Sequence, residues 1–244
     1  MASVGMVDPD SLERLVPDHV HQGITAADSL RLHLERYEFA ARHARPGRLL
    51  DLACGVGYGT RLVFDRGTGV ERALGVDLSA EAVGYARDRY AKPGIEFQTG
   101  NGLEFEDRDG FDTVVSLETV EHVPEPGRLL DRLAALVRPG GVLIASVPTT
   151  PTAFVNPHHL HDFTERSFRA LVERPGFREV THLTQRQPFS PLAILRREEP
   201  RMRDLRRNLA GYYLTHPRAA FERVVSTLRY GFANRYTTIA WRRG

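Results

Sequence analysis

Residues 49–59 read Leu-Leu-Asp-Leu-Ala-Cys-Gly-Val-Gly-Tyr-Gly, and this stretch decides the fold class. An apolar run that suits a buried strand ends in a turn with a glycine at every second position. Gly55, Gly57 and Gly59 lack the side chains that would keep a ligand away from the backbone. A helix-compatible stretch follows, so the segment predicts a strand–turn–helix unit that holds an adenosine-containing cofactor.

Similar apolar runs recur over the next hundred residues. They predict strands at residues 73–77, 95–98, 111–116 and 142–147, with a helix at 127–137 before the last strand. Asp77 ends the first of these runs, where an acidic side chain can accept both ribose hydroxyls of a nucleoside. The turn at residues 100–102 follows the second run and is placed to contact an adenine ring.

This ordered set of motifs, over roughly residues 45–148, resembles the class I S-adenosylmethionine-dependent methyltransferases. The segment Asp51-x-Ala53-x-Gly55-x-Gly57 resembles their acidic-x-Gly-x-Gly-x-Gly motif, with Ala53 in place of the first glycine. The resemblance implies an α/β fold. It has a doubly wound, Rossmann-like sheet of seven strands, an N-terminal lid helix and a helical insertion near the C-terminus.

The resemblance also implies S-adenosylmethionine as the cofactor. The residues expected to bind it are Tyr37, Ala53, Gly55, Gly57, Asp77, Leu78, Asn101, Gly102 and Glu118. Ala53 adds only a methyl group, so we expect a slightly tighter approach to the methionine moiety. A nicotinamide dinucleotide is the competing cofactor. Its G-x-G-x-x-G fingerprint has one more residue between the last two glycines than this chain has.

Length and composition fit a single domain. A chain of 244 residues at 41% hydrophobic content can bury one substantial core. We expect one domain over residues 1–244, with a lid at 1–47, a cofactor-binding core at 48–148 and an acceptor-binding remainder at 149–244. The net charge of +2 supplies no global field for nucleic acid. Without a signal-peptide pattern or an apolar run of about 20 residues, a cytoplasmic protein with no membrane span is expected.

The segments around the core carry further expectations. A helix at residues 28–44 would lie across the cofactor, with Tyr37 and Arg36 approaching its carboxylate. Thr164 would cap a helix at 166–173, and strands are expected at 176–187 and 235–241. Between them, the insertion at 189–232 predicts helices at 203–214 and 218–230. It could shape the acceptor pocket or form a homodimer contact.

The pattern Glu118-x-x-Glu121-His122 suggests a metal site. If the stretch is helical, the three side chains share one face and could hold a divalent ion. The pattern resembles the metal site of quinone-biosynthesis O-methyltransferases, which implies Mg²⁺ bound by Glu118, Glu121 and His122. Glu-His-Val is also frequent after the fourth strand of methyltransferases that use no metal, and this alternative stays open.

A bound cation could lower the pKa of an acceptor hydroxyl, and a histidine would then take its proton. His158 and His161, in the loop at residues 156–164, rank above His159 as that base. This loop and the segments at 11–17 and 32–40 resemble bacterial sugar and glycan O-methyltransferases. Within that group the chain is similar to the 1-O-methyltransferases of methylmannose polysaccharide biosynthesis. They act with Mg²⁺ on the 1-hydroxyl of a short 3-O-methylated mannoside.

Two other functions remain in view. The acceptor could be a phenol or a quinone precursor, in which case flat apolar molecules would be preferred. The chain could instead be a non-catalytic cofactor-binding protein that docks a partner through the arginine-rich run at 196–207. Turnover on a hydroxylated acceptor discriminates between these functions.

Overall fold

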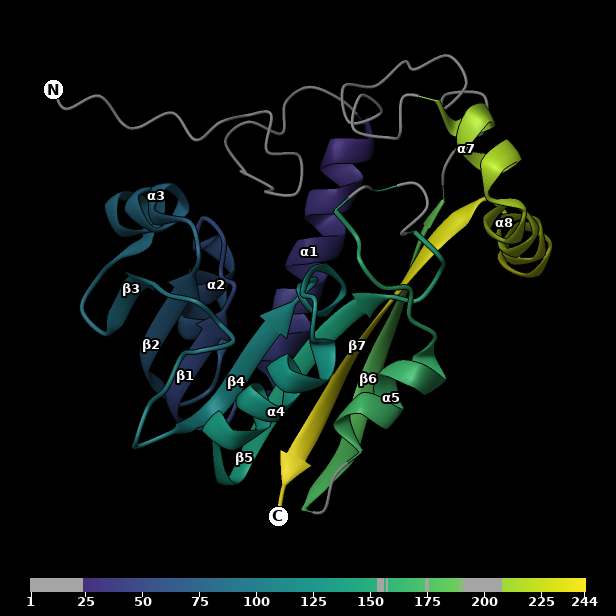
Figure 1. The fold of residues 1–244 in the computed structure, drawn as a ribbon. Helices are drawn as coiled ribbons and strands as arrows, with labels where there is room; N and C mark the ends of the chain where they lie inside the picture. Colours follow the sequence, from purple (N-terminus) through teal and green to yellow (C-terminus); the bar gives the residue numbers. More distant parts are fainter. Residues whose placement is uncertain (1–23, 153–155, 157, 174–175, 189, 191–207) are drawn as a thin grey trace, which may run out of the picture.

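A seven-stranded sheet forms the centre of the computed structural model (Figure 1). The model describes residues 24–152, 156, 158–173, 176–188, 190 and 208–244. The strands are β1 (Gly47–Leu52), β2 (Val70–Asp77), β3 (Ile95–Thr99), β4 (Phe111–Leu117), β5 (Val137–Pro148), β6 (Phe177–Pro188) and β7 (Ala233–Arg243). The helices are α1 (Ile24–His43), α2 (Tyr58–Arg66), α3 (Ala80–Tyr90), α4 (Pro126–Leu136), α5 (Glu165–Val172), α7 (Leu209–Thr215) and α8 (Pro217–Tyr230), with a 3₁₀ turn, η2, at Val120–His122.

The strand order is β3-β2-β1-β4-β5-β7-β6. The first five strands are parallel, and β7 runs antiparallel between β5 and β6. The chain leaves β1 toward β2 on one side and returns to β4 on the other, so the order reverses between β1 and β4. Ligands of doubly wound sheets bind at such a switch point, beyond the carboxyl ends of the strands. The doubly wound, seven-stranded α/β fold expected from the sequence is confirmed.

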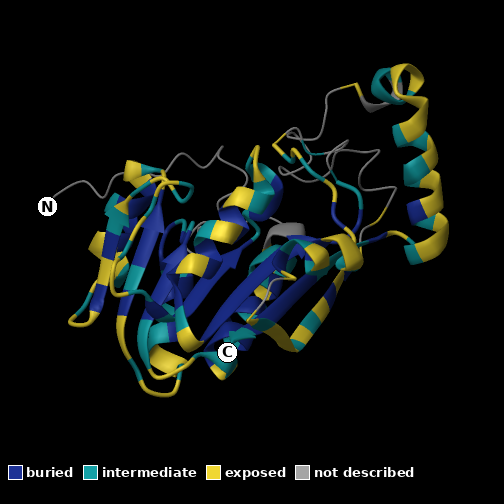
Figure 2. Cartoon of the chain, turned by 60° about the horizontal axis from the view of Figure 1, so that its bottom comes forward, coloured by how far each residue is buried: buried dark blue, intermediate teal, exposed yellow. Residues whose placement is uncertain are grey.

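Helices cover both faces of the sheet because successive strand residues point to opposite sides. Leu49 and Ile144 pack on the side of α1, α2 and α3. Their neighbours Leu50 and Leu143 pack on the side of α4 and α5. The central strands β1, β4 and β5 are accordingly buried from both sides, whereas β6 at the edge of the sheet is largely exposed (Figure 2). This sandwich of three layers leaves the ends of the strands as the accessible edges of the sheet.

Helix α1 is hydrogen-bonded to β6, the strand at one edge of the sheet. The Gln185 amide in β6 accepts a hydrogen bond from Arg36 Nε at 2.8 Å and donates to the Leu32 carbonyl at 3.1 Å. Gln187 donates to Ser29 Oγ at 3.0 Å. The helix expected at residues 28–44 is therefore present, begins four residues earlier, and is held as part of the fold.

The C-terminal insertion contributes α7 and α8 beyond the carboxyl edge of the parallel strands (Figure 1). Residues 203–207 of the expected first helix, and the arginine-rich run at 196–207, lie outside the described residues. In α8 only Ser226 is buried, while Phe221, Val224 and Leu228 are exposed (Figure 2). These three side chains recur at helical spacing and form an apolar face on α8.

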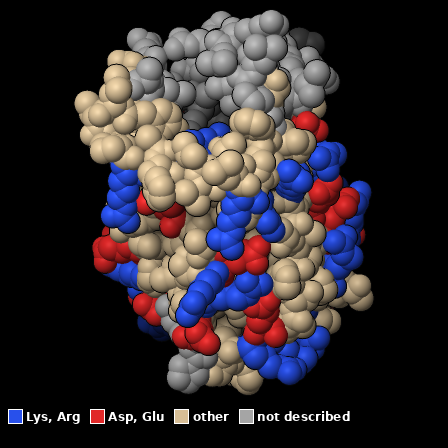
Figure 3. Space-filling view, turned by 90° about the vertical axis from the view of Figure 1, so that its right-hand side faces the viewer, with Lys and Arg blue, Asp and Glu red and all other residues tan. Residues whose placement is uncertain are grey.

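Surface charge is mixed. On the face shown in Figure 3, basic and acidic side chains are interspersed below an area with few charges. Surface ion pairs include Arg169 with Glu179 at 2.8 Å. Of the helices that the model describes, none has the length and apolarity needed to cross a bilayer.

Candidate functional site

The glycine turn after β1 lies at the switch point. Its three positions require glycine for different structural reasons. Gly55 has φ +56°, and a Cβ there would meet open space. A Cβ at Gly57 would lie 2.7 Å from the Phe97 ring, and one at Gly59 would lie 2.0 Å from the Tyr37 ring. Gly57 and Gly59 are therefore also required for the packing of the protein's own aromatic rings, a reason that the sequence analysis did not give. Gly55 is the position where a ligand can approach the backbone.

Ala53 occupies a left-handed conformation, with φ 65°. Its backbone N–H donates to the Val76 carbonyl at 2.7 Å, which fixes this conformation at the end of β1. L-residues other than glycine rarely adopt it, because Cβ crowds the neighbouring carbonyl oxygen. The turn that places Gly55 is thus strained at the position where the methyltransferase motif has glycine.

Ala53→Gly should stabilise the protein by about 1 kcal/mol, because glycine adopts φ 65° without strain. For a domain of this size the melting temperature should rise by about 3 °C, measured by calorimetry. Gly127→Ala, at a position with open space in α4, is a matched control for the change in backbone freedom. An unchanged or lower melting temperature for Ala53→Gly would contradict strain at this position.

Asp77 joins the turns that follow β1 and β2. Its Oδ2 accepts the Gly55 N–H at 2.8 Å and its Oδ1 accepts the Ser79 N–H at 2.9 Å. Each carboxylate oxygen can accept more than one hydrogen bond. The neighbouring Leu78 side chain is 73% exposed. Asn101 and Gly102 lie in the turn after β3, where Asn101 Oδ1 accepts the Leu103 N–H at 3.0 Å.

Asp51 at the end of β1 is a site residue that the sequence analysis did not single out. It is 1% exposed, and its Oδ2 accepts the Thr60 hydroxyl at 2.7 Å. Its Oδ1 makes no hydrogen bond of normal geometry with the described residues, although the Tyr37 phenol is near enough to Asp51 to favour its ionised form. Burial, with a smaller effect from the Asp77 charge, raises the pKa of Asp51 to about 7. The acidic position of the glycine motif itself was the signal for this residue.

Arg36 on α1 faces the same region from the opposite side. Its guanidinium is buried over the Tyr236 ring, 4.5 Å from the ring centre, and Nη1 lies 3.8 Å from Glu118 Oε2. Within the described part of the chain, Nη1 makes no hydrogen bond. Tyr37, the next residue, is buried near Asp51, and burial together with the Asp51 charge raises the pKa of its phenol well above its usual value. The buried guanidinium thus lies beside Glu118 at the end of β4, and the neighbouring Tyr37 ring packs against Gly59 of the glycine turn.

The stretch from Glu118 to His122 is not a continuous helix. Glu118 is left-handed, with φ 51°, and only the three residues of η2 that follow are helical. Glu118 Oε1 accepts the Ser146 hydroxyl at 2.7 Å. The helical arrangement considered for Glu118, Glu121 and His122 is therefore wrong. Glu118 turns toward β5 and Arg36 instead.

A different trio comes together: Glu121, His122 and His159, each of which has one donor atom within 4.8 Å of the others. The histidine loop is held against η2 because the Leu160 N–H donates to the Glu121 carbonyl at 2.8 Å. Burial and the nearby His122 and His158 charges lower the pKa of His159 to about 3, so its imidazole is neutral at neutral pH. The trio forms because this backbone hydrogen bond joins residues about 40 positions apart. The spacing of the residues in the sequence does not predict it.

The two histidines proposed as bases lie beside the trio. His158 is exposed, and its backbone carbonyl accepts His122 Nδ1–H at 3.1 Å. His161 Nε2–H donates to the Val123 carbonyl at 3.0 Å, which leaves Nδ1 as the nitrogen that can take a proton. Both belong to the carboxyl edge of the sheet, where an acceptor would enter.

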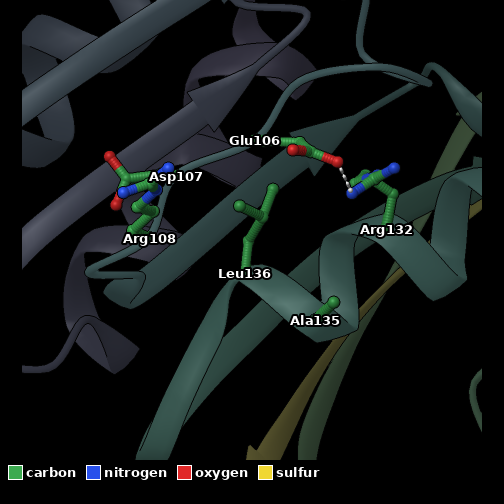
Figure 4. Close-up of a pocket in the computed structure, with 6 residues that line it drawn as sticks. All are labelled: Glu106, Asp107, Arg108, Arg132, Ala135 and Leu136. Carbon is green, nitrogen blue, oxygen red and sulfur yellow. Dashed lines mark hydrogen bonds and ion pairs between the residues drawn. The ribbon is translucent and has the colours of Figure 1, made fainter.

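A hollow of about 320 Å³ lies elsewhere, between the loop before β4 and the end of α4 (Figure 4). It is lined by Glu106, Asp107, Arg108, Arg132, Ala135 and Leu136. Two of its carboxylates form ion pairs, Glu106 with Arg132 at 3.1 Å and Asp107 with Arg48 at 2.9 Å. Because it borders the amino end of β4, opposite the glycine turn, it is not part of the site.

Comparison with known proteins agrees with this geometry. Residues 50–145 match the family model of the methyltransferase domain. A ubiquinone biosynthesis O-methyltransferase from Aeromonas salmonicida is 35% identical over 113 residues, which are 44% of this chain and 46% of that protein. A probable S-adenosylmethionine-dependent methyltransferase from Mycolicibacterium smegmatis is 29% identical over 154 residues, 60% of this chain and 58% of that protein. The chain thus spans about half the length of these relatives.

Solved structures show the same fold at low identity. The YcgJ protein of Bacillus subtilis has a TM-score of 0.64 at 16% identity, covering 86% of this chain and 99% of that one. The N-methyltransferase NodS of Bradyrhizobium japonicum, solved with S-adenosyl-L-homocysteine, has a TM-score of 0.60 at 15% identity, with 96% and 97% covered. Residues 50–145 therefore match the methyltransferase-domain family, and the chain as a whole shares the fold of these solved structures.

Proposed function

We propose that the protein transfers a methyl group from S-adenosylmethionine to a hydroxyl oxygen. The observation that carries this proposal is the charge arrangement around the glycine turn. Asp51 and Asp77 bring two carboxylates to the switch point, and Arg36 brings a guanidinium from the other side. S-adenosylmethionine has a ribose diol, a sulfonium, an ammonium and a carboxylate. The site offers a complementary group for the ribose diol, the ammonium and the carboxylate.

The cofactor roles follow from these contacts. Asp77 would accept the ribose hydroxyls, with Leu78, Asn101 and Gly102 around the adenine ring. The open space at Gly55 would take the sugar and methionine chain, which pass along the turn that Ala53 and Gly57 shape. Asp51 Oδ1 would accept the ammonium, and Arg36 Nη1 would donate to the carboxylate. Tyr37 and Glu118 would hold Asp51 and Arg36 in place.

Methyl transfer itself needs alignment more than chemical activation. The sulfonium carries a reactive methyl group, so the protein has to direct the acceptor oxygen in line with it and remove the hydroxyl proton. His158 and His161 are the proposed bases. Of the two, His161 has one nitrogen fixed by the Val123 carbonyl, so its other nitrogen has a defined direction.

The Mg²⁺ suggested by family resemblance does not match the donors that the structure assembles. Mg²⁺ prefers an octahedral shell of oxygen ligands. The assembled trio offers one carboxylate and two imidazoles, and Glu118, the second carboxylate of the sequence hypothesis, is paired with Ser146 and Arg36. We therefore derive no catalytic step through Mg²⁺.

Glu121→Gln should lower kcat at least about tenfold while S-adenosyl-L-homocysteine affinity stays within about twofold. Glu121 is buried beside His122 and its backbone anchors the histidine loop, so its carboxylate acts on the acceptor side. Steady-state kinetics and calorimetric titration check the two quantities. Any response of the wild type to added divalent ions should disappear in the variant, and persistence of that response would contradict a role for Glu121 in holding an ion.

For the acceptor we propose a sugar hydroxyl, in particular the 1-hydroxyl of a short 3-O-methylated mannoside. Three polar side chains lie at the proposed acceptor entrance: His158 and Asp162 are exposed and His161 is half-buried, beside the exposed Leu160. The anomeric hydroxyl is the most acidic one of a sugar, which suits deprotonation by an imidazole. The family model ends at residue 145, before this loop, so the matched core leaves the acceptor to be tested.

A phenol or quinone precursor is the second candidate. The function of the Aeromonas relative, O-methylation in ubiquinone biosynthesis, favours it. So does the apolar face of α8, formed by Phe221, Val224 and Leu228 at the same edge of the fold.

The deciding experiment measures transfer from labelled S-adenosylmethionine to 3-O-methylated mannosides and to a panel of phenols, with added divalent ions and with EDTA. Labelling of the mannosides alone supports the sugar assignment. Labelling of phenols alone overturns it and leaves O-methylation standing. Tight cofactor binding with no turnover on any acceptor would favour a non-catalytic cofactor-binding protein.

A further inference from the structure

Two imidazoles and one carboxylate converge next to the proposed reaction centre. Glu121 is 1% exposed, and its Oε1 lies 3.8 Å from His122 Nε2. The His122 and His159 rings meet edge to face, with their centres 4.7 Å apart. All three side chains offer a donor atom within 4.8 Å of the other two. Three potential ligands from two separate segments thus face one point.

Both imidazoles are oriented by a partner on Nδ1. His122 Nδ1–H donates to the His158 carbonyl at 3.1 Å, so its Nε2 carries the lone pair. His159 Nδ1 is hydrogen-bonded to the Thr152 hydroxyl at 2.6 Å, which fixes the ring and directs Nε2 away from that contact. Histidines that bind metals characteristically hold their second ring nitrogen in this way, because it sets the tautomer and the ring direction.

We propose that Glu121, His122 and His159 bind one transition-metal ion of the Zn²⁺ class in preference to Mg²⁺. Nitrogen ligands select the later divalent metals, and two histidines with one carboxylate form a ligand set found at catalytic Zn²⁺ sites. The ions of this class bind imidazole far more tightly than Mg²⁺, which dehydrates reluctantly and seeks oxygen. The inference concerns ion identity and does not depend on the acceptor or on methyl transfer.

The geometry requires only a local adjustment. In a tetrahedral site with bonds of about 2.0–2.1 Å, ligand atoms lie about 3.3 Å apart. The present separations of up to 4.8 Å therefore close by at most about 1.5 Å, within reach of side-chain rotation. Three protein ligands leave a fourth position for water or an acceptor oxygen, on the side where both imidazoles are partly exposed.

The test is direct metal binding by the full-length protein, prepared without a histidine tag and stripped with EDTA. Zn²⁺, Co²⁺, Mn²⁺ and Mg²⁺ are titrated separately by calorimetry, and Co²⁺ binding is also followed by its visible absorption. We expect one ion per chain, with Zn²⁺ and Co²⁺ bound at least about 100-fold more tightly than Mg²⁺. His159→Ala should weaken Zn²⁺ binding at least about 100-fold and remove the Co²⁺ absorption, while His182→Ala, in the surface pair with Glu179, should change neither.

S-adenosyl-L-homocysteine binding by His159→Ala shows that the variant is folded. If it is not, Thr152→Val serves as the second variant and should weaken Zn²⁺ about tenfold by releasing the His159 ring. Mg²⁺ bound as tightly as Zn²⁺, no stoichiometric binding of any ion, or full Zn²⁺ affinity in a folded His159→Ala would overturn the proposal. If any of these results is found while methyl transfer is intact, the metal proposal fails and the proposed function is unaffected. If Zn²⁺ binds tightly but no methyl group is transferred, the proposed function fails and the metal site is unaffected.

Discussion

Asp51→Asn is expected to make the cofactor-free protein more stable than the wild type at pH 8, with little difference at pH 4. The pKa of Asp51 lies near 7 in the folded protein against 3.8 in the unfolded chain. The protonated carboxyl therefore favours folding. This contribution is fully present below pH 3.8 and is lost as the pH rises through 7. A shift of about three pKa units corresponds to about 4 kcal/mol for this fully buried group.

Chemical denaturation at pH 4, 6 and 8 measures the effect, with Asp88→Asn on the exposed face of α3 as the control. The wild type and the control should lose stability over this range relative to Asp51→Asn. Equal pH dependence in all three proteins would show that Asp51 titrates normally. The same variant should bind S-adenosylmethionine poorly, because a neutral amide cannot neutralise the cationic end of the cofactor. Asp51 would then be a residue that gives up stability for binding.

Asp77→Ala is expected to lower S-adenosylmethionine affinity by more than about 100-fold. Two ribose hydroxyls would each lose a hydrogen bond to a charged acceptor, at about 1.5–3 kcal/mol apiece. The Gly55 and Ser79 N–H groups would also lose their acceptor, which loosens both turns that border the cofactor. Calorimetric titration with S-adenosyl-L-homocysteine measures the loss.

Asp77→Asn separates the two contributions, because its remaining oxygen can keep one of the turn contacts while the charge is gone. We expect it to bind more tightly than Asp77→Ala and more weakly than the wild type. Unchanged affinity in Asp77→Ala would exclude Asp77 from the ribose site and would require a different position for the cofactor.

The fold was predictable because its signals are local. Apolar strands, the glycine turn and the Thr164 cap all act within a few residues, and the structure has each of them. The observed ends of strands and helices differ from the predicted ends where tertiary contacts determine them. The strand expected at 142–147 begins earlier, at Val137. Gly140, with φ 76°, allows the backbone to continue as an irregular strand where the sequence suggested a turn.

The candidate site was harder to predict from the sequence than the fold, because two of its features depend on contacts between residues that are distant in the chain. His159 reaches Glu121 through backbone hydrogen bonds from the next two residues, which no spacing rule describes. Glu118 leaves the metal trio because its left-handed backbone interrupts the helix that the i, i+3, i+4 pattern suggests. Asp51 stood inside the motif, but its unpaired oxygen and raised pKa arise only from burial.

The contact between Arg36 and Gln185 joins residues 149 positions apart, and Tyr236 in β7 completes the enclosure of the same guanidinium. During synthesis from the N-terminus, the first half of the chain emerges with the glycine turn but without these partners. A ribosome-bound chain should therefore bind S-adenosylmethionine weakly until β7 has left the exit tunnel. If Arg36 binds the cofactor carboxylate as proposed, cofactor capture follows completion of the sheet, and a nascent chain stalled before β7 would not sequester the cofactor.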